Sequence, residues 1–423
     1  MSETAEIVVV GAGPAGLSAA LAAAPSGASV VILDDNPLPG GQIWRDGPKA
    51  HLPSAAIELR EQVAACANIK IHSGTRVVAL AGERSLLLED FERGWRLDYR
   101  KLILCTGARE LLLPFPGWTL PGVTGAGGLQ ALIKGGVPVD GQHVVIAGSG
   151  PLLLASAATA RANGAKILRI AEQASWRAVA RFALKLPRWP NKLLQSFSLY
   201  DPAYRADSHV VAALGTDHLE GVRISQGGRL KEIACDRLAC GFGLIPNVQL
   251  GQALGCTLDD GAIRVDAWQA SSHDGIYAAG ECTGFGGSEK ALVEGRIAGH
   301  AAVGEHDRAR ELWSQRQRWQ GFAKALGRDF ALDPRLNQLA QPDTLVCRCE
   351  DVPYSALAGK PDWTAAKLAS RCGMGACQGR VCGAAAKQLF GWQPPTPRPP
   401  FSPARVETLL QLAEDGNSGR VTP

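Results

Sequence analysis

The chain has 423 residues, of which 46% are hydrophobic and 20% are charged, with 49 glycines and 26 prolines. This length corresponds to about three domains, and the composition excludes a disordered chain, a collagen-like repeat and a coiled coil. The net charge of +4, without a run of five basic residues, argues against nucleic-acid binding. No apolar run reaches the roughly 18 residues that a membrane span requires. We therefore expect a cytoplasmic protein, and peripheral contact with the inner face of a membrane is left open.

The N-terminal segment predicts a βαβ unit. A short β-branched strand leads into Gly11, Gly13 and Gly16, and a helix and a second buried strand follow, ending at Asp34. In such a turn the first two glycines let the backbone approach a pyrophosphate, and the third lets the helix pack closely on the strand. The helix N-terminus then faces the negative charge. Asp34 stands where a carboxylate can accept a hydrogen bond from a ribose hydroxyl, so the unit predicts a dinucleotide site.

A related unit recurs in the middle of the chain. Gly148 and Gly150 repeat the turn, but Leu153 stands at the third glycine position, where its side chain would hold the helix off the strand. At the place of the ribose-binding acid stands Ala171, with Glu172 one residue later. Two interpretations stay open. One is a nicotinamide site that favours NADH over NADPH. The other is a retained fold without nicotinamide turnover, or with another nucleotide bound.

Three further segments have distinctive compositions. The segment 176–200 carries five basic residues and no acid. Two interpretations stay open for this segment. It is either a face that docks on a partner or a membrane surface, or a pair of solvated helices. A charged amphipathic helix at 305–326 is expected to link two domains. Six prolines between 394 and 403 predict an extended stretch, followed by a last short helix at 405–414.

Five of the eleven cysteines lie close together near the C-terminus. Cys347 and Cys349 form a Cys-x-Cys pair, and Cys377 and Cys382 form a Cys-x4-Cys pair after a helix-sized interval. Four thiolates suit a [2Fe–2S] cluster, a [4Fe–4S] cluster or zinc alike, although Cys-x-Cys is not a usual zinc-finger spacing. Cys372 is a fifth thiol whose role is left open.

These motifs together resemble the flavoproteins with two dinucleotide-binding domains. The stretch 274–281 resembles their C-terminal flavin motif, with Glu281 where Asp is usual, and 102–107 resembles their central Thr-Gly motif. The reactive cysteine pair of their disulfide reductases is missing beside these motifs, so thiol–disulfide chemistry is not expected. The resemblance implies that FAD contacts Gly11, Gly13, Pro14, Ala15, Gly16, Asp34, Asp35, Gly41, Gln42, Val77, Thr106, Gly107, Gly280, Glu281, Lys290 and Ala291.

The cysteine stretch resembles the [2Fe–2S] domain of the bacterioferritin-associated ferredoxin type, which is a small helical fold. That family usually has Cys-x2-Cys as its second pair, and the Cys-x4-Cys here is a departure. The resemblance implies a [2Fe–2S] cluster held by Cys347, Cys349, Cys377 and Cys382. Zinc and a degenerate site remain the alternatives.

Nearly the whole chain resembles the α-type subunits of hetero-oligomeric, dye-linked amino-acid and opine dehydrogenases. The stretches 108–123, 240–244 and 373–380 carry this likeness. It implies three partners: a catalytic β subunit of the D-amino-acid-oxidase type, a small γ subunit, and an electron acceptor such as a quinone. The partner would oxidise a substrate of the D-hydroxyproline, proline, opine or glycine type, and this chain would relay the electrons.

Two other hypotheses stay open. The first is a self-contained NAD(P)H-dependent reductase with FAD and [2Fe–2S], in which Gly148, Gly150 and Glu172 form the second nucleotide site. The second is an assembly subunit whose cofactors are mainly structural.

The predicted fold is α/β, with two Rossmann-like dinucleotide-binding domains and a small helical [2Fe–2S] domain. We divide the chain into an FAD-binding domain (1–113 and 238–304), a second nucleotide domain (114–237), a linker helix region (305–340), a [2Fe–2S] domain (341–392) and a Pro-rich tail (393–423).

Overall fold

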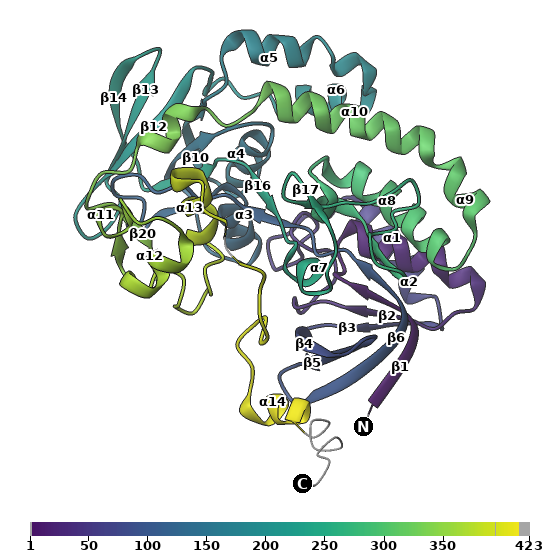
Figure 1. The fold of residues 1–423 in the computed structure, drawn as a ribbon. Helices are drawn as coiled ribbons and strands as arrows, with labels where there is room; N and C mark the ends of the chain where they lie inside the picture. Colours follow the sequence, from purple (N-terminus) through teal and green to yellow (C-terminus); the bar gives the residue numbers. More distant parts are fainter. Residues whose placement is uncertain (1, 394, 414–423) are drawn as a thin grey trace, which may run out of the picture.

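The first sheet gathers strands from two distant parts of the chain (Figure 1). In the computed structural model, which describes residues 2–393 and 395–413, this sheet has seven strands in the order β3-β2-β1-β6-β5-β4, with β19 beside β6. Its parallel strands are β1 (Ser2–Val10), β2 (Val30–Leu33), β3 (Ile69–His72), β6 (Gly94–Leu104) and β19 (Ile276–Ala278). The antiparallel strands β4 (Arg76–Gly82) and β5 (Ser85–Glu89) extend one edge.

Two small-residue helices lie against one another beside this sheet. Helix α1 (Pro14–Ala23) is almost wholly buried, and it packs on α8 (Gly287–Ala302). At Gly295 and Gly299 an added Cβ would stand 2.2 Å from a carbonyl oxygen of α1, so only glycine permits this approach. Smaller elements complete this part of the chain: α2 (Ser54–Ala64), α7 (Gln249–Ala253), β17 (Leu258–Asp259) and β18 (Ala262–Ile263).

The second sheet is parallel throughout, in the order β11-β10-β9-β15-β8. Its strands are β8 (Val123–Gly125), β9 (His143–Gly148), β10 (Lys166–Glu172), β11 (Tyr204–Arg205) and β15 (Arg237–Gly241). Helices α3 (Ala126–Lys134) and α4 (Leu152–Ala162) pack on it, and β12 (Ser208–Leu214), β13 (Gly221–Gln226) and β14 (Arg229–Ala234) form an antiparallel sheet. The chain crosses between the two halves at the paired strands β7 (Ala108–Glu110) and β16 (Leu244–Pro246).

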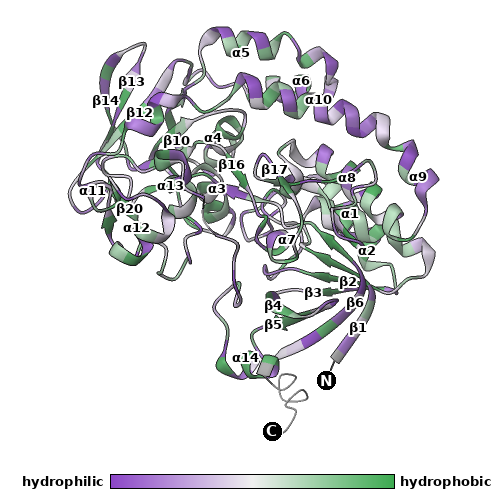
Figure 2. Ribbon diagram, viewed as in Figure 1, coloured by the Kyte–Doolittle hydropathy of each residue, from purple (hydrophilic) through white to green (hydrophobic). Residues whose placement is uncertain are grey.

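A layer of polar helices lies across both halves. Figure 2 shows hydrophilic residues along α9 (His306–Glu311) and α10 (Trp313–Asp329), whereas β2 and β5 of the first sheet are mostly hydrophobic. The single helix expected at 305–326 is divided at Leu312, which ends α9 and precedes α10. Helix α10 packs on α5 (Trp176–Ala183) and on α8, and α6 (Pro190–Ser198) follows α5. In the described part of the chain, no helix is both long and apolar enough to cross a bilayer.

The cysteine-rich stretch folds around a hydrophobic cluster of its own. We call it the cysteine unit; it comprises β20 (Leu345–Cys347), β21 (Val352–Pro353), α11 (Tyr354–Leu357), α12 (Trp363–Ser370) and α13 (Cys382–Phe390). After α13 an irregular segment runs back to the first half, where α14 (Val406–Ala413) packs on β5 and β6 (Figure 1). Pro394 of the predicted extended stretch and Glu414 of the predicted last helix lie outside the described residues.

Candidate functional site

The first glycine turn has the geometry that its sequence predicts. Gly11 has φ +109°, and an added Cβ there would stand 2.2 Å from the carbonyl oxygen of Cys105. At Gly16 an added Cβ would stand 1.8 Å from the carbonyl oxygen of Gly11. Gly13, just before α1, differs, because the nearest atom to an added Cβ is the Cα of Gly41 at 3.8 Å. Packing therefore requires glycine at positions 11 and 16, whereas Gly13 leaves room for a ligand beside the helix N-terminus.

The two acids after β2 lie in different surroundings. Asp34 is buried, and its carboxylate accepts hydrogen bonds from the backbone N–H of Ala12 at 2.5 Å and of Asn36 at 2.8 Å. Asp34 therefore holds the glycine turn and the following loop together. The side chain of Asp35 is exposed. The acid that the sequence analysis placed on the ribose is thus engaged by the protein backbone, and its neighbour is the carboxylate that faces outward.

Residues from three other segments of the chain meet at this turn. Gly40 donates its N–H to the carbonyl of Ala12 at 2.7 Å, which brings the loop of Gly41 and Gln42 against the turn. The N–H of Thr75 donates to the carbonyl of Asp34 at 2.8 Å, so β4, which contains Val77, starts beside the acid. Thr106 and Gly107 follow β6, next to β1, at the end of the sheet where the turn lies.

The C-terminal flavin motif closes the site from the other side. An added Cβ on Gly280 would stand 2.8 Å from the Cβ of Ala15 and 3.6 Å from that of Ala291. Burial raises the pKa of Glu281, and the positive charge of Lys290 opposes this shift. Thus Glu281 and Lys290 lie close to one another at the motif.

A buried ion pair supports this motif. Lys290 Nζ lies 2.7 Å from Glu294 Oε2, and both side chains are buried. Glu294 also accepts hydrogen bonds from the N–H of Gly280 and the hydroxyl of Thr283. Helix α8 begins at Gly287, three residues before Lys290, so Lys290 and Glu294 both lie on this helix. The sequence analysis missed Glu294, although its spacing of four residues from Lys290 is a recognisable helical signal.

The two cysteines beside the flavin motifs have no features of reactive thiols. Burial raises the pKa of Cys282 to about 11, and burial together with Cys282 raises the pKa of Cys105 well above its usual range. Both thiols are therefore protonated near neutral pH and are poor nucleophiles.

The second glycine turn is bound by the chain's own carboxylate. Glu172 is fully buried, and it accepts hydrogen bonds from the N–H of Gly150 at 2.7 Å and of Ala174 at 2.8 Å. The amide of Gly150, which would face a pyrophosphate in a nucleotide site, is thus already used. Leu153 is accommodated because Gly241 lies opposite, where an added Cβ would stand 3.1 Å from the leucine side chain.

A segment of the chain also covers this turn. We call residues 330–333 the covering segment. The Ser149 hydroxyl donates to the carbonyl of Phe330 at 2.9 Å, and the Gln173 side chain donates to the carbonyl of Ala331 at 2.9 Å. Two atoms of the Phe330 side chain lie 3.8 Å from an added Cβ on Gly150.

The residue before the covering segment anchors it. The buried carboxylate of Asp329 forms ion pairs with Arg181 at 2.6 Å and Lys185 at 3.4 Å. Two cations of the basic segment 176–200 are thus used inside the molecule. The covering segment is therefore held between the second glycine turn and α5.

Glu172 makes stability depend on pH. Burial raises its pKa to about 7, although hydrogen bonds from the backbone N–H groups oppose the shift. The native state binds this proton more tightly than the unfolded chain does. The protonated Glu172 carboxyl therefore contributes fully to the free energy of unfolding below the pKa that this group has in the unfolded chain. The contribution is lost as pH rises through about 7. We expect wild type to lose about 3 kcal/mol of stability from this group between pH 4.5 and 8. Urea unfolding across this range, compared with Glu172→Gln, isolates the effect; parallel pH profiles would contradict it.

The five clustered cysteines lie in one region but in two environments. The sulfurs of Cys347, Cys372 and Cys382 lie within 4.8 Å of one another and are buried. Cys349 is exposed, Cys377 is partly exposed, and their thiols share a hydrogen bond. The four predicted ligands are among the six residues that line a hollow of about 320 Å³, which are Cys347, Arg348, Cys349, Cys377, Val381 and Cys382.

The loop around Cys377 favours a thiolate. Burial raises the pKa of Cys377, but hydrogen bonds lower it by more than this, so the net shift is downward. The donors are Val381, the Cys349 thiol, Gly379 and Arg380. Backbone N–H groups directed at sulfur are a feature of iron–sulfur loops. The donor set and the hollow therefore fit a metal–sulfur centre, with Cys372 behind Cys382 as an additional thiol.

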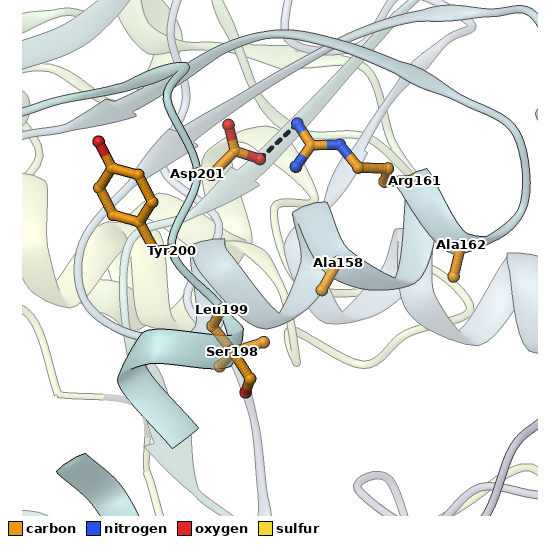
Figure 3. A pocket seen from close by; sticks show the side chains of 7 residues that line it. All are labelled: Ala158, Arg161, Ala162, Ser198, Leu199, Tyr200 and Asp201. Carbon is orange, nitrogen blue, oxygen red and sulfur yellow. Dashed lines mark ion pairs between the residues drawn. The ribbon is translucent and has the colours of Figure 1, made fainter. Parts of the chain in front are cut away.

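A further hollow of about 270 Å³ lies between α4 and the end of α6 (Figure 3). Arg161 forms an ion pair with the buried Asp201 at 2.6 Å, and the other carboxylate oxygen of Asp201 accepts from the N–H of Ala203. Both charges are thereby compensated. The pair fixes the connection that leads into β11.

The two nucleotide-type folds, with the flavin motifs gathered at the first glycine turn, define a flavin-dependent oxidoreductase. This chain belongs to the pyridine nucleotide-disulphide oxidoreductase family, whose model matches residues 5–305. The predicted enzyme class and the predicted α/β flavoprotein fold are confirmed. The small [2Fe–2S] domain stays a prediction.

Two relatives are similar over nearly the whole chain. Hydrogen cyanide synthase subunit HcnB of Pseudomonas aeruginosa is 33% identical over 418 residues, covering 89% of this chain and 90% of the relative. An opine oxidase subunit of Rhizobium meliloti is 30% identical over 462 residues, covering 97% of this chain and 99% of the relative. The predicted resemblance to such subunits is thus confirmed.

Solved structures show the same fold. L-proline dehydrogenase from P. horikoshii superposes with a TM-score of 0.68 at 19% identity, covering 97% of this chain and 80% of that chain. Thioredoxin reductase of T. acidophilum superposes with a TM-score of 0.56 at 24% identity, covering 72% of this chain and 99% of that chain.

Proposed function

We propose that this chain is the electron-transferring subunit of a hetero-oligomeric FAD-dependent dehydrogenase that acts on an amino acid or amine. Bound FAD would supply two-electron chemistry and a [2Fe–2S] cluster one-electron steps, so that together they connect a two-electron donor to a one-electron acceptor. The FAD would lie in a domain formed by 1–113 and 238–304, and the cluster in a domain formed by 341–392. Residues 114–237 would form the second nucleotide domain, 305–340 the linker helix region and 393–423 the Pro-rich tail. The relatives that are named as subunits of larger enzymes support a multi-subunit assembly.

The chain's own residues would divide the work of holding FAD. The turn of Gly11, Gly13 and Gly16 would meet the pyrophosphate with backbone N–H groups. Asp35 would accept from the ribose, because Asp34 is occupied by the backbone. The remaining predicted contacts are Pro14, Ala15, Gly41, Gln42, Val77, Thr106, Gly107, Gly280, Glu281, Lys290 and Ala291. Cys347, Cys349, Cys377 and Cys382 would hold the cluster.

The covered second glycine turn carries the proposal. Its backbone amide is bound by Glu172, and Phe330 lies over Gly150. A nicotinamide nucleotide would have to displace both. Electrons would therefore enter from a partner, which would be a catalytic β subunit of the D-amino-acid-oxidase type. A small γ subunit would complete the assembly, and the electrons would leave to an acceptor such as a quinone.

The exposed side of α5 and α6 would provide contact outside the chain. Leu184, Leu194 and Phe197 are 82%, 68% and 71% exposed, which is unusual for side chains of this size. Arg177 and Arg188 of the same segment are exposed as well. This surface would suit a partner subunit or the inner face of a membrane.

Anaerobic titration of the purified chain tests the proposal. We expect neither NADH nor NADPH to bleach the flavin absorbance near about 450 nm, and dithionite to bleach it fully. Adding the partner with its substrate should then reduce the flavin. Rapid bleaching by NADH would instead establish a self-contained reductase with a working second nucleotide site. A chain that lacks flavin but still supports its partner would establish an assembly role.

A further inference from the structure

The cysteine unit is hydrogen-bonded to the central flavin motif. Arg109 Nε donates to the carbonyl of Arg380 at 3.1 Å, and Arg109 Nη1 donates to Asn247 Oδ1 at 2.9 Å. Asn247 Nδ2 in turn donates to the carbonyl of Thr106 at 2.9 Å, and the Thr106 hydroxyl donates to the carbonyl of Asn247. Arg380 lies between Cys377 and Cys382. One continuous set of hydrogen bonds therefore joins the second cysteine loop to the Thr-Gly motif.

The first cysteine pair is held in a similar way. Trp118 Nε1 donates to the carbonyl of Leu345 at 2.6 Å, and the guanidinium of Arg348 lies 5.3 Å from the centre of the Trp118 ring. Arg109 and Trp118 both belong to the connection that leads from the first half of the molecule to the second. This connection thus fixes both cysteine pairs, so the position of the cysteine unit relative to the glycine turn is defined.

Two arginines of like charge lie at this junction. Arg109 is half-buried, and its pKa is lowered by burial and by the nearby charge of Arg380. The Arg380 side chain also interacts electrostatically with Asp35, beside the glycine turn. Among the described residues, no carboxylate lies within ion-pair distance, 4.0 Å, of either guanidinium. A pair of cations with no carboxylate in ion-pair contact, next to a dinucleotide turn, is suited to a phosphate.

We propose that Arg109 and Arg380 bind the phosphates of FAD, so that the cysteine loop closes over the dinucleotide. The inference rests on the proposed function, because it requires FAD at the first glycine turn. Arg380 belongs to the cysteine unit and Arg109 to the flavin-binding half. The dinucleotide would therefore join the two parts, and FAD binding and assembly of the metal centre would stabilise one another.

The affinity of the FAD-depleted protein for FAD tests this inference. We expect Arg380→Gln to raise the Kd for FAD about tenfold or more, as for the loss of a hydrogen bond to a charged group. ADP carries the same phosphates, so its Kd should rise in parallel. Arg380→Lys keeps the charge but not the planar fork, and it should fall between wild type and Arg380→Gln. Arg398→Gln removes an exposed arginine of the tail and should leave both Kd values unchanged.

Iron content and visible circular dichroism provide the second readout. In wild type, FAD should slow the removal of iron by a chelator, and Arg380→Gln should abolish this protection. If Arg380→Gln loses the cluster outright, Arg109→Gln, which alters no residue of the cysteine loop itself, replaces it in the FAD titration. Suppose that wild type binds FAD but the Kd for FAD is unchanged in Arg380→Gln, or in Arg109→Gln where that variant replaces it. This result overturns the inference and leaves the proposed function standing. A wild-type chain that binds no FAD overturns both.

Discussion

Replacement of Cys382 by alanine is expected to remove nearly all iron and acid-labile sulfide from the purified chain. Cys382 is 1% exposed and lines the hollow beside the other predicted ligands, and its sulfur lies within 4.8 Å of those of Cys347 and Cys372. A cluster that loses one of its protein thiolates is not retained. Iron should fall from about two atoms per chain, the content of a [2Fe–2S] cluster, to less than about a tenth of that.

Companion variants decide which thiols are the ligands. Cys256→Ala removes a buried cysteine outside the cysteine unit and should leave the iron content unchanged. Cys372→Ala should retain the cluster if Cys347, Cys349, Cys377 and Cys382 hold it. Loss of iron in Cys372→Ala with retention in Cys349→Ala would place the centre on the buried thiols instead. Full iron content in Cys382→Ala would contradict the prediction altogether.

Two glycine substitutions in the first turn are expected to separate stability from flavin binding. In Gly16→Ala the new Cβ would stand 1.8 Å from a carbonyl oxygen, so we expect a loss of roughly 3 kcal/mol or more in unfolding free energy. In Gly13→Ala the nearest atom is 3.8 Å away and φ is −74°, which alanine adopts readily. This variant should keep its stability, while its Kd for FAD rises about a hundredfold because the methyl group meets the pyrophosphate.

Urea unfolding and FAD titration of the same preparations measure both effects. Gly27→Ala is a suitable control, since Gly27 has φ +80° but an added Cβ would meet nothing within 4 Å. It should cost about 1 kcal/mol of stability and leave FAD binding unchanged. Wild-type affinity for FAD in Gly13→Ala would mean that the dinucleotide does not lie at this turn.

Short-range patterns could be predicted from the sequence because they depend on neighbouring residues. Gly11 and Gly16 are required by a tight turn from strand to helix, so their spacing alone predicts the turn that the structure contains. Cys347 and Cys349 line the same hollow, and their separation by one residue predicts that they lie close together. The expected helix at 305–326 was less accurate, since the break at Leu312 depends on how α9 and α10 pack on α8.

Asp34 shows why sequence position alone leaves a side chain's role open. An acid at the end of the second strand matches the ribose-binding pattern, and both Asp34 and Asp35 satisfy it. Which of the two acids is left for a ribose depends on which carboxylate accepts from the backbone N–H groups of Ala12 and Asn36 in the folded chain. The same is true of Cys372, whose sulfur approaches Cys347 and Cys382 only after α12 and α13 have packed together.

The class of protein, the flavin motifs and the cysteine cluster could all be read from residue order, because each consists of residues that are close along the chain or in a recognisable succession. The state of the second glycine turn depends instead on long-range packing. Phe330 lies far from Gly150 in the sequence, and Glu172 closes the turn only when β9 and β10 pair. Likewise, Arg109 and Arg380 meet only because the cysteine unit packs on the crossover between the two halves. Such contacts result from the burial of whole surfaces against one another, and no local pattern encodes them.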